Sequence, residues 1–250
     1  MNAETKKNLT DCFQHPLMPK TFSPAEKFCQ SIFPQFSDNL VVTDDIVYQH
    51  KDHFNKYKGK TLMLVAGGPS SNNDWDSIDY DYLWSMNHFF LNEKLKNKKV
   101  DLAMILGEVN LNSKPFVNYI QEYGTFLGFE INKMWSNVDF SDYKNCFCMH
   151  TKFYSRLGVA ARMLIFAAEL GFKKIFFTGL DGPEPIFKGE HAFEHGKKTM
   201  PYSFSGLSKE KIIEVYEYQY NVFWDYILKL YPEAVFKNVG GGKRYHPKHL

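Results

Sequence analysis

The feature that most constrains the fold is the continuous apolar run Thr61-Leu62-Met63-Leu64-Val65-Ala66. A strand that is apolar at consecutive positions is buried on both faces, which is typical of a parallel sheet. Gly67-Gly68-Pro69-Ser70-Ser71 follows directly and predicts a tight turn at the carboxyl end of this strand. The run therefore indicates an α/β fold whose core strands carry glycine-rich turns at their ends.

A second unit of the same kind lies at 158–182. An apolar helical pattern over Gly158–Leu170 ends at Gly171, an apolar strand follows at Ile175–Thr178, and Gly179-Leu180-Asp181-Gly182 closes it. Further strands are predicted at 83–87, 100–106, 145–150 and 234–236, a helix at 118–123, and a long amphipathic helix from the Ser208 cap to about Leu230. We therefore expect a Rossmann-like, doubly wound, mostly parallel sheet with helices on both faces.

The chain divides into an N-terminal helical arm at 1–58 and a Rossmann-like nucleotide-binding domain at 59–250. The arm is polar and punctuated by prolines, whereas the apolar strands begin after Lys58-Gly59-Lys60. Within the domain, the segment 183–206 is long for a connection and is rich in charges, histidines and glycines. Such a length favours either a functional, lid-like loop or partial disorder.

Charge and cysteine content exclude several classes of function. The net charge of +2, from 30 basic and 28 acidic residues, leaves no basic surface for nucleic acid. The N-terminal segment Met1–Thr10 is polar, so we expect no signal peptide. The longest apolar stretch, around Leu157–Leu170, is too short and too charged for a membrane anchor. The four cysteines form no C-x-x-C pair, so we expect reduced thiols and a cytoplasmic location. Whether the protein is a homo-oligomer stays open.

Ligands of doubly wound sheets bind beyond the carboxyl ends of the strands, which selects the segments 67–71, 87–88 and 179–182. In the first, Gly67 and Gly68 let backbone N–H groups approach a phosphate, Pro69 stiffens the turn, and Ser70 adds a hydroxyl. A plain strand-to-loop turn is the alternative interpretation. The segment is neither a P-loop nor a G-x-G-x-x-G motif.

Polar side chains at the other strand ends could contact the same ligand. The amide of Asn87 could bind a base or a ribose, and the carboxylate of Asp181 could bind a hydroxyl or act as a general base. Each has a structural alternative, as a turn asparagine and as a turn or N-cap aspartate. Arg156 at the start of the apolar helix could contact a phosphate.

His191 and His195 are the candidate catalytic histidines of the lid-like loop. Their spacing of four would place both rings on one helix face, but the motif is not H-E-x-x-H and glycines flank it closely. A general base or a phosphate contact is favoured over a metal site, and a surface role is the alternative. No metal ligand set is therefore assigned.

As a set, these motifs resemble a bacterial and archaeal superfamily. The opening of that superfamily is similar to a series of motifs here: Lys58-Gly59-Lys60, an apolar strand, G-G-P-S and a strand that ends in Asn87. Its second half is similar to G-F-K-K-I, followed here by a strand and G-L-D-G. The superfamily includes motility-accessory-factor proteins that glycosylate flagellin, hydroxymethylpterin-diphosphokinase-like proteins and the family 42 bacterial sialyltransferases. The resemblance covers roughly residues 55–230.

The resemblance implies binding of a CMP-linked sugar without a metal. It implies that the nucleotide is bound by Gly68, Pro69, Ser70, Asn87, Leu157, Gly158, Gly179 and Asp181. Gly206-Leu207-Ser208-Lys209 stands where the sialyltransferases carry a G-H-S-K histidine, and leucine cannot accept a proton. His191 is similar to the histidine after G-x-D in the motility-accessory-factor group, which makes it the first candidate to replace the missing base, with His195 second.

Three functions follow as hypotheses. The first is a metal-independent glycosyltransferase that moves a CMP-linked nonulosonate sugar to a glycan or protein acceptor. The second is a pterin-type diphosphokinase, which needs ATP and Mg²⁺ and would use Asp74, Asp76, Asp79 and Asp181 around the phosphates. The third is a non-catalytic nucleotide-binding protein, supported by Leu207.

Overall fold

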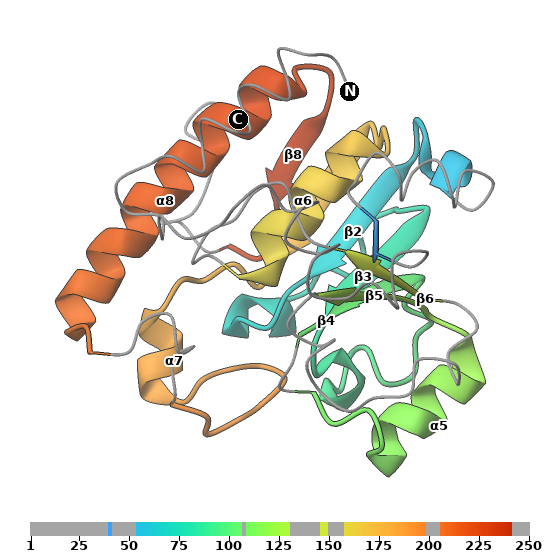
Figure 1. Ribbon diagram of the computed structural model, residues 1–250, viewed down its shortest axis with the longest axis horizontal. Helices are drawn as coiled ribbons and strands as arrows, with labels where there is room; N and C mark the ends of the chain where they lie inside the picture. The colour runs from blue at the N-terminus through green and yellow to red at the C-terminus, as the bar shows by residue number, and fades with distance from the viewer. Residues whose placement is uncertain are drawn as a thin grey trace.

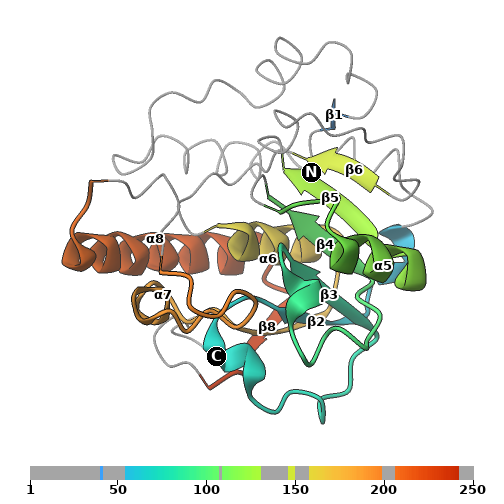
Figure 2. The ribbon, with the colours of Figure 1, turned by 90° about the horizontal axis from the view of Figure 1, so that it is seen from below.

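The computed structural model describes residues 40–41, 54–106, 109–130, 146–149, 158–198 and 206–241. Among these residues, eight strands form one sheet in the order β1-β6-β5-β4-β3-β2-β7-β8, and every pairing is parallel. The strands are β1 Leu40–Val41, β2 Thr61–Val65, β3 Tyr82–Met86, β4 Leu102–Ile105, β5 Phe126–Glu130, β6 Cys146–Met149, β7 Lys174–Thr178 and β8 Val235–Asn238. Figure 2 shows them fanning from β8 to β1.

The described helices are α5 Lys114–Tyr123, α6 Val159–Glu169, α7 Glu184–Lys188 and α8 Lys209–Leu230, with 3₁₀ turns η2 Asn55–Tyr57, η3 Pro69–Asn72 and η4 Phe89–Leu91. Helix α5 ends at Gly124, which adopts the left-handed conformation that a helix stop requires. Helix α8 starts at Ser208, whose Oγ accepts a hydrogen bond from the Lys211 N–H at 3.3 Å.

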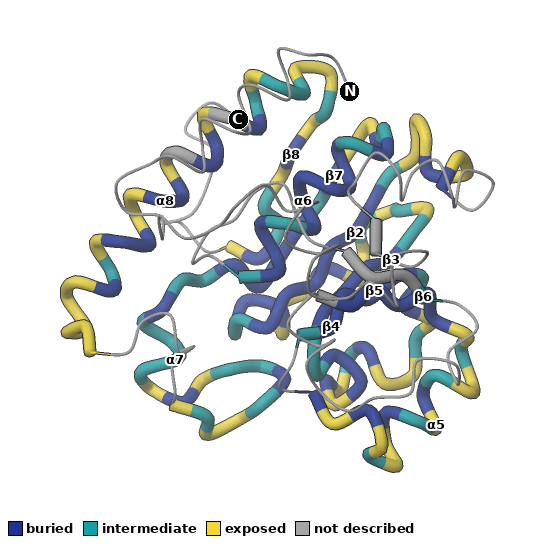
Figure 3. Tube along the Cα trace, in the orientation of Figure 1, coloured by how far each residue is buried: buried dark blue, intermediate teal, exposed yellow. Residues whose placement is uncertain are grey.

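Helices α6 and α8 cover the same face of the sheet (Figure 1). Leu64 of β2 is in register with Trp84 of β3 and with Phe177 of β7, so the three side chains share one face. Trp84 packs against Phe166 of α6, and Phe177 stacks on Trp224 of α8. Figure 3 shows the central strands mostly buried and the outer side of α8 exposed.

The strand order contains a topological switch point between β2 and β7. From β2 the chain runs outward through β3, β4, β5 and β6, whereas from β7 it runs to β8 on the opposite side. The connections that leave the carboxyl ends of these two neighbours therefore diverge, and ligands of open parallel sheets bind in the crevice between them. Here the two diverging segments begin at Gly67 and at Gly179.

The predicted α/β, Rossmann-like class is confirmed, and a helical layer on the second face stays a prediction. The long helix is confirmed at Lys209–Leu230, and its apolar stripe is buried except for half-buried Leu230. Strand β5 had not been predicted, because Gly128 interrupts a run of only five residues. Most of the predicted arm at 1–58 lies outside the described residues, although Phe54 and Tyr57 at its end are buried in the core.

Candidate functional site

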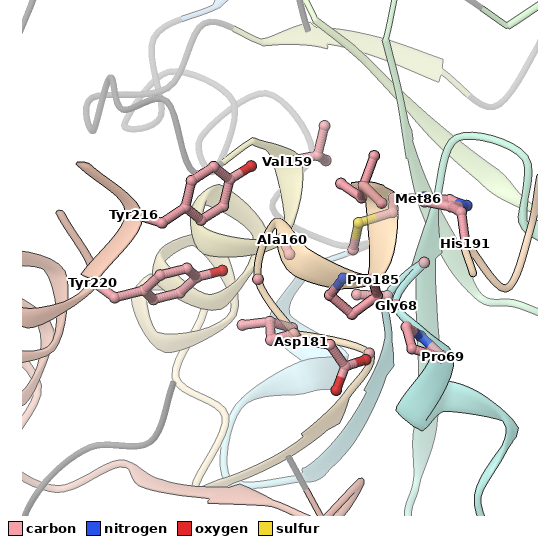
Figure 4. Close-up of a pocket in the computed structure, with 16 residues that line it drawn as sticks. Gly68, Pro69, Met86, Val159, Ala160, Asp181, Pro185, His191, Tyr216 and Tyr220 are labelled. Carbon is pink, nitrogen blue, oxygen red and sulfur yellow. The ribbon is translucent and has the colours of Figure 1, made fainter. Parts of the chain in front are cut away.

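A pocket of about 120 Å³ opens at the switch point, where the carboxyl ends of β2, β3 and β7 meet α6 and α8 (Figure 4). Its walls are Ala66, Gly67, Gly68, Pro69, Met86, Val159, Ala160, Gly179, Leu180, Asp181, Gly182, Pro185, Ile186, His191, Tyr216 and Tyr220. A wider groove of about 580 Å³ shares Pro69, Asp181 and Pro185 with it and adds Glu184, Phe187, Lys188 and Lys209. Asp181 therefore stands between two adjoining spaces.

Asp181 is fixed against the first glycine-rich turn. Its Oδ2 accepts a hydrogen bond from the Ser70 N–H at 2.9 Å. A Cβ added at Gly68 would lie 2.2 Å from the same oxygen and 2.5 Å from the Gly179 carbonyl oxygen. Since real Cβ atoms do not approach so closely, glycine at position 68 is what allows the carboxylate to lie beside the turn.

His191 is fixed against the neighbouring glycine. A Cβ at Gly67 would lie 2.4 Å from His191 Cε1 and 2.5 Å from Nε2, and the Ala192 N–H donates to the Gly67 carbonyl at 2.8 Å. His191 Nδ1 accepts a hydrogen bond from the Phe193 N–H at 3.3 Å. In a neutral imidazole this leaves the proton on Nε2, so the atom beside Gly67 is an N–H donor.

Ser70 ties the ends of β2 and β7 together. Its buried Oγ accepts a hydrogen bond from the Gly179 N–H at 2.9 Å, and its carbonyl accepts one from Thr178 Oγ1 at 2.9 Å. Gly240 after β8 packs on the same node, because a Cβ there would lie 2.2 Å from Thr178 Oγ1 and 2.6 Å from Ser70 Oγ. The hydroxyl of Ser70 thus makes a hydrogen bond within the protein that holds the two strand ends together.

We expect Ser70→Ala to lower the free energy of unfolding by about 1–3 kcal/mol, because it leaves the buried Gly179 N–H without an acceptor. Chemical denaturation measures the change. Ser77→Ala, at an exposed position, is the control and should leave the free energy of unfolding unchanged. A Ser70→Ala variant as stable as the parent would contradict the structural role of this hydroxyl.

The glycine-rich turn offers fewer amides to a phosphate than its sequence indicates. The Gly68 N–H donates to the Gly179 carbonyl, the Ser70 N–H to Asp181, and the Ser71 N–H to the Gly68 carbonyl. Pro69 has no N–H. The two glycines instead admit His191 and Asp181 to the edge of the pocket.

The amino end of α6 provides an alternative place for an anion. Val159 and Ala160, its first residues, line the pocket. Gly158 precedes them as the N-cap and, as a glycine, has no side chain that could accept a hydrogen bond from the helix. The first N–H groups of a helix lack partners within the helix and carry its positive dipole end. No acidic residue lies in this first turn. An anionic group in the pocket would therefore be stabilised here.

The other residues predicted for the site do not all lie in the pocket. Asn87 adopts φ 51°, which asparagine tolerates, and its Oδ1 accepts a hydrogen bond from the Leu106 N–H at 2.9 Å, so its amide oxygen joins two strand ends. His195 is exposed and does not line the pocket. Arg156 and Leu157 lie outside the described residues. The structure thus brings Asp181 and His191 together with the glycines and leaves His195 apart.

The carboxylates proposed to hold magnesium are not gathered around the pocket. Asp74, Asp76 and Asp79 are exposed, and of the four only Asp181 is in the pocket wall. Asp76 pairs instead with Lys98 at 3.0 Å and with Lys94 at 3.4 Å. Among the described residues, no group of three or more His, Cys, Asp or Glu side chains could hold a metal ion.

Several wall residues had no signal in the sequence. Tyr216 and Tyr220 lie on the apolar face of α8 and are buried, yet they also reach the pocket (Figure 4). Met86 reaches it from the end of β3. The spacing of four between the tyrosines shows that they share a helix face, but what that face meets depends on tertiary packing.

Comparisons with family models, with curated proteins and with solved structures gave no match for this chain. In the described residues, no helix has both the length and the apolar character needed to cross a membrane.

Proposed function

We propose that the protein is a transferase for a nucleotide-activated sugar, of the CMP-linked nonulosonate class implied by the superfamily resemblance. The observation that carries the proposal is the docking of one carboxylate and one imidazole on successive glycines at the switch point. This arrangement places two groups suited to proton transfer and hydrogen bonding beside a helix amino end, which suits a phosphorylated donor.

The donor phosphate binds at the amino end of α6 in this proposal. Val159 and Ala160 supply the helix end, and the His191 Nε2–H lies at another wall of the same pocket. Both features favour negative charge, which a departing nucleotide monophosphate carries. Tyr216 and Tyr220 supply an aromatic wall with hydroxyl groups for the remainder of the donor.

Asp181 is the general base of the proposed reaction, and His191 is the donor to the leaving group. An Asp181 carboxylate oxygen takes the proton of the acceptor hydroxyl while the oxygen of that hydroxyl forms the new bond to the anomeric carbon. The bond from this carbon to the phosphate oxygen breaks, and the nucleotide monophosphate leaves with the electron pair. This assignment makes Asp181 rather than His191 the base, because the His191 Nδ1 contact orients an N–H toward Gly67.

The acceptor lies in the wider groove, which meets the pocket at Asp181. Lys188 and Lys209 bring positive charge to this groove, and Lys209 Nζ lies 5.5 Å from the centre of the Phe187 ring. These cations offset the carboxylates Asp181 and Glu184 in the same space. The geometry disfavours a diphosphokinase, since three of the four carboxylates that it would need lie away from the pocket.

The first test is a thermal-shift screen against cytidine, uridine, guanosine and adenosine nucleotides, each with Mg²⁺ and with EDTA. A ligand at 100 times its Kd stabilises the folded state by about 2.7 kcal/mol, which raises the Tm by roughly 5–10 °C for a chain of this size. We expect cytidine monophosphate to raise the Tm equally under both conditions. A response to ATP that needs Mg²⁺ would favour the kinase, and no response from any nucleotide would contradict the proposal.

A further inference from the structure

Residues 189–196 form a closed loop, termed here the histidine loop, which carries His191. Its two ends meet at Gly189 and Gly196, where the Gly196 N–H donates to the Gly189 carbonyl at 2.8 Å. A Cβ at Gly189 would lie 3.2 Å from Gly196 Cα, so the neck is in close contact. The Glu190 N–H also donates to the Pro185 carbonyl at 2.9 Å, which fastens the neck to α7.

The tip of the histidine loop contacts the turn after β2. The Ala192 N–H bonds to the Gly67 carbonyl, and Phe193 is buried with 4% of its surface exposed. The His191 ring lies against Gly67 and 5.9 Å from the Phe193 ring. A further attachment of the loop outside the pocket would help to hold His191 in this position.

Glu194 provides such an attachment on the other side of the loop. Its Oε2 lies 3.1 Å from His88 Nδ1, just beyond the end of β3, and both side chains are largely buried, with 21% and 16% exposed. Lys197 contacts the same carboxylate at 3.0 and 3.1 Å. The contact between His88 Nδ1 and the carboxylate is close but is not an aligned hydrogen bond, and it is an ion pair only when the imidazole is protonated.

The Glu194 carboxylate is held in its charged form. Burial by itself would raise its pKa, but the contacts with His88 and Lys197 outweigh burial and lower the pKa to about 2. A carboxylate with a lowered pKa stabilises the folded form above its unfolded pKa, and this stabilisation is lost as the pH falls through about 2. Glu194 is therefore ionised throughout the neutral range.

We infer that Glu194 and His88 form a positioning pair that holds the histidine loop so that His191 faces the pocket. Neither residue lines the pocket, so the pair acts on a ligand only through His191. The value of this position for catalysis rests on the proposed function, whereas the position of His191 itself can be measured in the protein without any ligand.

The test is the Glu194→Gln variant, observed by the NMR signal of the His191 Cε1–Hε1 group. This group lies against Gly67, so its chemical shift reports docking, and exposed His195 in the same loop is an internal reference. The signal is assigned by its loss in His191→Gln. We expect it to move toward the His195 position in Glu194→Gln, and trypsin to cleave after Lys197 and Lys198 about tenfold faster.

Glu190→Gln is the matched control, because it removes the same charge from an exposed position of the same loop. It should leave both the His191 signal and the cleavage rate unchanged. His88→Gln removes the other member of the pair and should reproduce the Glu194→Gln result. The double variant should show no larger change in the His191 signal or the cleavage rate than either single variant. This second variant decides the question if Glu194→Gln does not fold.

An unmoved His191 signal in folded Glu194→Gln and His88→Gln would overturn the inference. The same shift in Glu190→Gln would also overturn it, since loop charge rather than the pair would then be responsible. Failure of the nucleotide screen would instead contradict the proposed function and leave this NMR result intact, so the two failures are distinguishable.

Discussion

Gly179→Ala is expected to lower the free energy of unfolding by about 3–5 kcal/mol and the Tm by roughly 10 °C. Gly179 has φ 79°, which costs an L-residue with a Cβ about 1–2 kcal/mol. The new Cβ would also lie 2.2 Å from the Ala66 carbonyl oxygen and 2.5 Å from its carbon. Both are backbone atoms, so no side-chain rotation relieves the overlap. Denaturant unfolding of the purified variant measures the loss.

Gly124→Ala separates the two causes of this loss. Gly124 ends α5 with φ 61°, but a Cβ there would meet nothing within 4 Å. This variant should therefore carry only the conformational cost of about 1–2 kcal/mol. Equal destabilisation of the two variants would mean that the ends of β2 and β7 are not in close contact. It would contradict the pocket described at these two strand ends.

The fold followed from local patterns because its central strands are buried on both faces. The runs at 61–66 and 175–178 are apolar at consecutive positions, so strand type and burial could be predicted without tertiary information. The order of the strands could not be predicted, because the pairing of β2 with β7 joins residues more than a hundred positions apart. Strand β5 was missed since Phe126–Glu130 is short and contains a glycine.

The glycine-rich turn shows why the site was predicted only in part. Its position at a strand end was a sound guide to the pocket, because ligands of parallel sheets bind there. The expected approach of backbone N–H groups at Gly67 and Gly68 to a phosphate stays a prediction. The sequence did not indicate which side chains lie beside Gly67 and Gly68. In the structure they are His191 and Asp181, which come from much later in the chain and occupy the space that an added Cβ would take.

Asp181→Asn is expected to lower kcat by about 10²–10⁴-fold if the proposed transfer takes place, because an amide cannot accept the proton of the acceptor hydroxyl. The fold should change little. The amide oxygen can still accept the hydrogen bond that the Ser70 N–H now gives to Oδ2 at 2.9 Å. Release of cytidine monophosphate from a CMP-linked sugar, with and without an acceptor, measures the effect, and a Tm close to that of the parent verifies folding.

Asp81→Asn is the matched control, because the Asp81 Oδ2 accepts the Thr61 N–H at 2.8 Å at the opposite, amino end of β2. It changes the same chemical group in a similar backbone contact, away from the pocket, and should leave kcat unchanged. His191→Gln retains an N–H donor without the imidazole and should lose less activity than Asp181→Asn, because in the proposed mechanism His191 donates a hydrogen bond and takes no proton. The reverse order of losses would make His191 the base, and equal activity in all three variants would remove Asp181 from the mechanism.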